Sequence, residues 1–211
     1  GLGDVYKRQL RYGFKHRGRR FRVCYFQPES ALNQKDAQRY AQNEITCNRQ
    51  WFYSDTTHNS VDMVLAVNGI PVFAFELKNQ FTGQTVENAK QQWMHDRDPR
   101  EVCFQFNKRI LGYFCVDLTE VWMATRLAGK DTRFLPFNQG SNGAGRDGGA
   151  GNPPNPNGYL TAYLWEEVFQ KDSMMDILQK FMSLQDGKTL IFPRYLSLIH
   201  ISEPTRRTPI S

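Results

Sequence analysis

The stretch SVDMVLAVNGIPVFAFELKNQ, residues 60–80, decides the fold around it. Two apolar runs flank Asn68-Gly69, a dipeptide typical of the tight turn in a β-hairpin. Side chains alternate between the two faces of a strand, so Glu76 and Lys78 are expected on one face and Leu77 in the core. The stretch therefore predicts a hairpin whose charged residues lie at the rim and whose apolar residues lie in the core.

The length of the turn decides whether Asp62 and Glu76 share a face, because a shift of one residue reverses every side chain. A two-residue loop would pair Asp62 with Phe75 and leave Glu76 on the opposite face. A three-residue loop over residues 67–69 would pair Asp62 with Ala74 and make Glu76 a same-face diagonal neighbour, roughly 7–8 Å away. We predict this odd-length loop or an equivalent bulge, since only then can both carboxylates hold one divalent ion.

The order of an aspartate followed by Glu-x-Lys resembles the PD-(D/E)xK nuclease superfamily, with Val61 where the superfamily name places proline. A longer resemblance covers roughly residues 10–195 and is to the amino-terminal nuclease domain of the R subunit of type I restriction enzymes. The runs that carry it are NRQWFYS (48–54), VDMVLAVNGIPVFAFELKN (61–79), FQFNKRILGYFCVD (104–117), TRFLPFNQG (132–140) and GNPPNPNGYLTAYLWEEV (151–168).

This resemblance implies an α/β fold, the restriction-endonuclease-like sandwich with a central mixed β-sheet flanked by helices. It also implies Asp62, Glu76 and Lys78 as the catalytic residues. Asp62, Glu76 and the backbone carbonyl of Leu77 would bind Mg²⁺, a hard cation that prefers oxygen ligands. Lys78 would orient the attacking water and offset the charge that develops on phosphorus. From the residues alone, the alternative for Glu76 and Lys78 is an exposed pair at a strand end.

A second motif of many relatives, Gln-x-x-x-Tyr, lies on the helix that follows. Gln92 matches its first position, but Asp96 stands where the tyrosine would be. An auxiliary role for Gln92, through a hydrogen bond to Lys78 or to the DNA backbone, is left open against a surface glutamine. Trp93 is expected to be a core residue.

The biology that the resemblance implies is Mg²⁺-dependent cleavage of double-stranded DNA. The partners would be the modification and specificity subunits of a restriction complex, and LIFPRYL (190–196) resembles the approach to an ATP-driven motor. ATP would bind only that motor and not these residues. The alternatives are a repair or junction-resolving nuclease of the same superfamily and a catalytically inert DNA-binding module of this fold.

Hydrophobic periodicity predicts strands interleaved with helices, as in an α/β sandwich. The predicted strands are 46–53, 61–67, 70–78, 110–116 and 120–125, besides an apolar strand after the basic stretch 11–26, and the predicted helices are 33–45, 85–97 and 174–182. In the last helix the inner stripe is Met174, Ile177, Leu178 and Phe181. The Gly/Asn/Pro-rich segment 139–158 predicts a surface loop.

Both ends of the chain are expected to lie outside the domain. GLGDVYKRQ (1–9) and SLIHISEPTRRTPIS (197–211) resemble translated sequencing-adapter sequence, so residues 1–9 and 196–211 are expected not to pack and residues 10–195 to form the nuclease domain. The downstream motor is then missing.

Composition narrows the remaining classes. The formal net charge of +6 suits a polyanionic partner. Two interpretations of the basic stretch 11–26 stay open: its cations contact phosphates, or it is a solvated connection. The cations are Arg11, Lys15, Arg17, Arg19, Arg20 and Arg22. Four cysteines without short spacings argue against zinc and disulfides, and they are interpreted as small core residues. No run is long and apolar enough to span a bilayer, so a cytoplasmic protein is expected.

Overall fold

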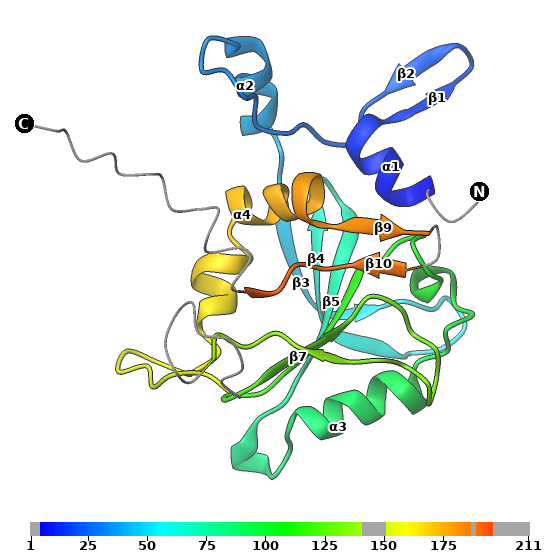
Figure 1. The fold of residues 1–211 in the computed structure, drawn as a ribbon. Helices are drawn as coiled ribbons and strands as arrows, with labels where there is room; N and C mark the ends of the chain where they lie inside the picture. Colours follow the sequence, from blue (N-terminus) through cyan, green and yellow to red (C-terminus); the bar gives the residue numbers. More distant parts are fainter. Residues whose placement is uncertain (1–4, 141–150, 187–188, 196–211) are drawn as a thin grey trace, which may run out of the picture.

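A six-stranded mixed sheet forms the centre of the molecule (Figure 1). The computed structural model describes residues 5–140, 151–186 and 189–195. The strands lie in chain order, β3 to β8, and only β5 and β6 run parallel. The predicted mixed α/β architecture is thereby confirmed. The strands are β3 (Ile45–Phe52), β4 (Ser60–Val67), β5 (Ile70–Leu77), β6 (Gly112–Val116), β7 (Val121–Ala124) and β8 (Leu135–Pro136).

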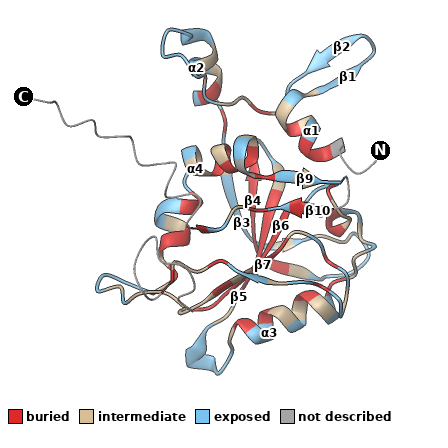
Figure 2. Ribbon diagram, in the orientation of Figure 1, coloured by how far each residue is buried: buried red, intermediate tan, exposed pale blue. Residues whose placement is uncertain are grey.

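Both faces of the sheet are covered, as the buried residues in Figure 2 show. One face packs under α3 (Val86–Gln91) and its continuation η3 (Gln92–Asp96). These helices, together with η2 (Gln80–Thr82) and η4 (Val102–Phe104), connect β5 to β6. The other face holds the larger apolar cluster. Residues from α1 (Val5–Tyr12), α2 (Gln34–Ala41), η5 (Leu164–Val168), α4 (Lys171–Asp176), η6 (Ile177–Phe181), β9 (Ser183–Gln185) and β10 (Thr189–Ile191) contribute to it.

Helix α3 begins at a capping box. The Thr85 hydroxyl oxygen accepts from the backbone N–H of Glu87 at 3.3 Å, and the Asn88 side chain accepts from the Thr85 N–H at 2.9 Å. These bonds satisfy backbone donors that a helix start leaves free. Trp93 is fully buried and donates its indole N–H to the Phe114 carbonyl at 3.1 Å, so it is the core residue that was predicted.

The hairpin between β4 and β5 has a two-residue turn. Val67 pairs with Ile70, while Asn68 and Gly69 both have positive φ, 50° and 81°. This is the conformation that Asn-Gly adopts most readily, and its twist matches that of the flanking strands. The three-residue loop predicted from the sequence is therefore wrong.

A bulge in β5 nevertheless places Asp62 and Glu76 on the same face of the sheet. The register shifts between Leu65 and Ala66, so that Val72 has no partner on β4 and Met63 pairs with Phe75. Continued by one step, this register places Asp62 opposite Glu76. The predicted alternative of an equivalent bulge is confirmed, and the two acids become direct neighbours on one face instead of diagonal ones.

The amino-terminal region differs from the prediction. Residues 1–9 were expected not to pack, but α1 begins at Val5, and Tyr6 is 6% exposed and donates its hydroxyl to the Pro71 carbonyl at 2.8 Å. Tyr6 is amphipathic, and the edge of the large cluster offers it both apolar contact and an acceptor. Residues 1–4 lie outside the description.

The basic stretch forms a hairpin instead of a connection to one strand. Strands β1 (Phe14–His16) and β2 (Arg19–Phe21) pair around a turn in which Arg17 and Gly18 both have positive φ. The hairpin projects from the body beside α1 (Figure 1). Arg11, in α1, donates to the carbonyls of Leu178 and Met182 at 2.8 and 2.6 Å, so it ties α1 to the end of η6.

Most other boundaries agree with the prediction within a few residues. The last helical segment begins earlier, at Lys171, and its expected inner residues Met174, Ile177 and Leu178 are buried. The side chain of Phe181, the fourth expected inner residue, lies outside the description. The described parts of the predicted loop 139–158 contain neither helix nor strand, and its residues 141–150 lie outside the description. Residues 196–211, at the carboxyl-terminal end, also lie outside the description. Three cysteines are buried, but Cys47 is exposed on β3, so the core role predicted for it is wrong.

Candidate functional site

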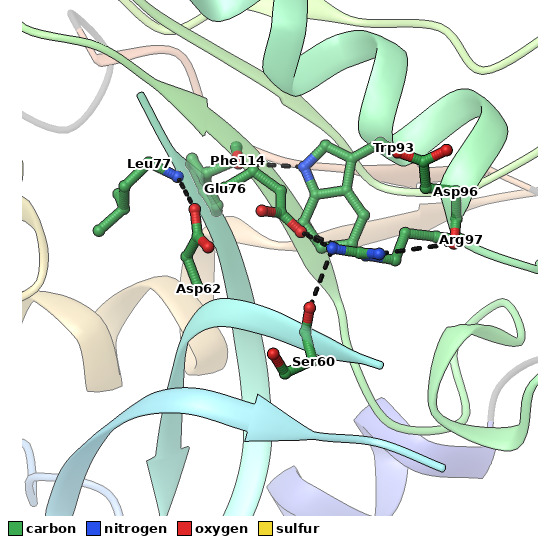
Figure 3. A network of polar contacts seen from close by, with 8 residues as sticks. All are labelled: Ser60, Asp62, Glu76, Leu77, Trp93, Asp96, Arg97 and Phe114. Atoms are coloured by element: carbon green, nitrogen blue, oxygen red, sulfur yellow. Dashed lines mark hydrogen bonds and ion pairs between the residues drawn. The ribbon is translucent and has the colours of Figure 1, made fainter. Parts of the chain in front are cut away.

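Asp62 and Glu76 meet where β4 begins and β5 ends (Figure 3). The Asp62 Oδ2 atom accepts a hydrogen bond from the backbone N–H of Leu77 at 2.8 Å. This bond crosses from one strand to the other and fixes the aspartate beside the glutamate. The predicted convergence of the two carboxylates is therefore present.

Glu76 is fully buried, whereas Leu77 is 38% exposed. The prediction that Leu77 points into the core and the charge stays at the rim is wrong. A sheet between two packed layers buries both faces, and alternation then decides only which layer a side chain enters. The Glu76 side chain lies in the layer under α3. The Leu77 side chain lies on the opposite face, where it is partly exposed.

Arg97 is the partner of Glu76 and was missed by the sequence analysis. Its Nη2 and Nε atoms donate to Glu76 Oε1 at 2.7 and 3.2 Å, and Nη2 also donates to the Ser60 carbonyl at 2.9 Å. The guanidinium is 5.7 Å from the ring centroid of Tyr53. Arg97 directly follows η3, in extended backbone, and is 9% exposed. An arginine in the segment DRDPR carries no periodic signal, so its burial could not be read from the sequence.

The second oxygen of Glu76 is buried without a partner. Oε2 accepts no hydrogen bond from the described residues, and Figure 3 shows the oxygen that is not paired with Arg97 on the side of Asp62. Burial raises the pKa of Glu76 to about 7, Arg97 opposes the rise, and the Asp62 carboxylate adds to it. Two carboxylates close together, one of them buried, form a site that favours a cation.

Lys78 directly follows β5, and strand alternation puts it on the same face as Glu76. Its backbone N–H donates to the Val116 carbonyl at 2.7 Å, which extends the pairing of β5 with β6 by one residue. Cys115 pairs with Glu76 across the two strands. Burial raises the pKa of the Cys115 thiol, and the charges of Lys90, Glu76, Glu87 and Lys78 act on it more weakly.

Gln92 lies at the junction of α3 and η3. It is half-buried, and its Oε1 atom accepts no hydrogen bond from the described residues. The suggested bond from Lys78 to this oxygen is therefore not formed. Asp96, at the position of the motif tyrosine, is exposed, and its carbonyl accepts from Arg97 Nη1 at 3.5 Å.

The backbone beside Asp62 is irregular. In the pairing of β3 with β4, Arg49 lies opposite Met63 and Trp51 opposite Val61, so Gln50 stands across from Asp62. Gln50 has a φ of 49°, which is uncommon for any residue except glycine. Asp62 thus faces a break in the ladder on one side and Glu76 on the other.

The donor set fits a hard divalent cation. Among the described residues, no group of three His, Cys, Asp or Glu side chains could hold a metal. A cation here would depend on Asp62, Glu76, a backbone carbonyl such as that of Leu77, and water. Mg²⁺ keeps several waters and often uses only one or two carboxylates. The unpartnered Oε2 atom of Glu76 is the structural feature that fits such an ion.

The fold and the acid pair can be compared with one class of protein. A mixed sheet with helical layers on both faces and two acids on adjacent strands is compatible with a restriction-endonuclease-like fold. The sequence model of the family described as "Type I restriction enzyme R protein N terminus" matches residues 17–140. The chain therefore belongs to this family, and the matched range includes every residue of the site. A search of the curated proteins finds no match.

A membrane-spanning helix was not expected. Across residues 5–140, 151–186 and 189–195, no helix has the length and apolar character needed to cross a bilayer.

Proposed function

We propose that this chain is the DNA-cleaving domain of a type I restriction enzyme R subunit and hydrolyses phosphodiester bonds with the help of Mg²⁺. The observation that carries the proposal is the pair of carboxylates on one face. Asp62 is fixed by the Leu77 N–H, Glu76 by Arg97, and Oε2 of Glu76 remains available. The family match supports the biological setting.

The chemistry assigns a role to each side chain. Asp62 and Glu76 would hold the metal, with the Leu77 carbonyl as a third ligand. A bound divalent cation neutralises phosphate oxygens and lowers the pKa of a coordinated water. Lys78 would orient the attacking water and stabilise the charge that develops on the phosphate. Gln92, with its unpartnered oxygen, has an auxiliary role toward that water or the DNA.

The surface toward DNA includes the β1–β2 hairpin. Lys15, Arg17, Arg19, Arg20 and Arg22 are all exposed, and none forms an ion pair with a described residue. Such cations bind phosphates without reading sequence. In the full enzyme, an ATP-driven motor and the modification and specificity subunits would supply translocation and recognition, in the cytoplasm.

The test is cleavage by the reassembled restriction complex carrying Asp62→Asn or Lys78→Ala in its R subunit. Each variant should lose Mg²⁺-dependent cleavage by at least about 10²-fold, the typical effect of removing one electrostatic contribution at an active site. ATP hydrolysis and DNA affinity should remain. Lys130→Ala, which removes an exposed lysine between β7 and β8, serves as the control. Undiminished cleavage in both site variants would contradict the proposal, and a wild-type complex that never cleaves would favour an inert module.

A further inference from the structure

We infer that Arg97 is a positioning residue for metal binding, which commits Oε1 of Glu76 to the protein and leaves Oε2 for the ion. This inference rests on the proposed function and deepens it. Arg97 itself lies on the side of Glu76 away from Asp62 (Figure 3). It therefore acts through the glutamate and does not occupy the space between the two acids.

The form of the ion pair carries the argument. An arginine and a carboxylate often pair through two parallel N–H···O bonds, one to each oxygen. Here Nε and Nη2 both donate to Oε1, at 3.2 and 2.7 Å, and Nη2 also reaches the Ser60 carbonyl at 2.9 Å. This pairing leaves Oε2 buried and without a partner.

Arg97 is held in place by three elements. It follows η3, its Nη2 bonds the first residue of β4, and its Nη2 and Nε bond the penultimate residue of β5. The Tyr53 ring, just after β3, lies against the guanidinium. The planar fork can address Oε1 and the Ser60 carbonyl together, and the ammonium of lysine has no such fixed geometry.

Without Arg97 the glutamate would lose its orientation. The terminal torsion of a glutamate is broad, so the carboxylate is not fixed by its own rotamer preferences. The Asp62 carboxylate beside it would favour turning Oε2 away. Residues that orient a metal ligand from behind typically contribute 10–100-fold to metal affinity.

The experiment measures Mn²⁺ binding by electron paramagnetic resonance on the reassembled complex without nucleotide, together with the Mg²⁺ concentration for half-maximal cleavage. Arg97→Met should weaken Mn²⁺ binding at least about tenfold. It should raise the half-maximal Mg²⁺ concentration similarly, with cleavage partly restored at high Mg²⁺. Arg97→Lys should lie between Arg97→Met and the wild type. A residue with a purely structural role would lower the melting temperature without moving the metal dependence.

Arg100→Met is the matched control, because Arg100 lies three residues away, with its side chain 91% exposed, and pairs with Asp98 at 2.9 Å. It should leave Mn²⁺ binding unchanged. Unchanged or tighter Mn²⁺ binding in Arg97→Met would overturn the inference. If that variant does not fold, unchanged binding in Arg97→Lys would overturn it instead.

The two proposals fail in different ways. If the wild type binds Mn²⁺ and Asp62→Asn abolishes that binding, a wild-type result for Arg97→Met removes only the role of Arg97. If the wild-type complex binds no Mn²⁺ that depends on Asp62, both proposals are wrong.

Discussion

At the scale of single residues, Gly112 shows how closely the core is packed around the first residue of β6. A Cβ atom at this position would lie 3.1 Å from the rings of both Phe73 and Phe114, which are themselves fully buried. We predict that Gly112→Ala lowers the free energy of unfolding by about 1–3 kcal/mol, the usual cost of overpacking. Urea denaturation would measure it.

Gly158→Ala provides the comparison, because the nearest atom to a Cβ there is 3.7 Å away. It should change the free energy of unfolding by less than about 0.5 kcal/mol. Equal stability of the two variants would show that the rings beside Gly112 can move.

The candidate site was predictable from the sequence in its acids but not in its surroundings. Asp62, Glu76 and Lys78 stand out because charge is rare beside such apolar runs. The burial of Glu76 and the exposure of Leu77 depend on a second layer that one strand cannot reveal. Arg97 reaches Glu76 only because η3 ends in extended backbone, and a contact across 21 residues leaves no local pattern.

At the scale of elements, the β1–β2 hairpin is the feature whose function can be measured most directly. We predict that Arg17→Gln combined with Arg20→Gln lowers the slope of log affinity for DNA against log salt by about 2, because each phosphate contact contributes about 0.9. Filter binding of the full complex at several salt concentrations would give the slope.

The matched control removes two exposed cations elsewhere, Lys35→Gln combined with Lys130→Gln, one on α2 and one beyond β7. It should leave the slope near that of the wild type. Equal slopes in both double variants would mean that the hairpin affects DNA binding only through the net charge of the protein.

Long periodic elements were easier to predict than short ones. Strands β4 and β5 and the helical segment formed by α3 and η3 have clear alternation, turn or capping signals, and their bounds agree within a few residues. The hairpin at 14–21 was missed because its strands have only three residues each and its turn is Arg-Gly. Strands β9 and β10 were missed for a similar reason, since their pairing and the large cluster, instead of local propensity, define them.

At the scale of the whole molecule, the burial of thiols gives a test of the packing. Cys24, Cys103 and Cys115 are buried, and burial raises the pKa of Cys24 to about 11 and of Cys103 to about 12. Thiols react as thiolates, so these three cysteines should react slowly with alkylating reagents. We predict that iodoacetamide at pH 8 labels Cys47 first among the four, as read from peptide mass spectra.

Guanidinium chloride is the control condition, because all four thiols should label at similar rates once the chain is unfolded. Rapid labelling of Cys24 in the native protein would show that the contact between the amino-terminal segment and the large cluster opens readily.

The bulge at Val72 has a consequence for how this segment can vary in length. Because the face of each acid depends on whether the number of residues between them is odd or even, gaining or losing one residue there separates Asp62 from Glu76. Gaining or losing two brings them back. Functional homologues should therefore differ in this interval by even steps, and an odd step should be found only with a compensating odd step or with a lost acid.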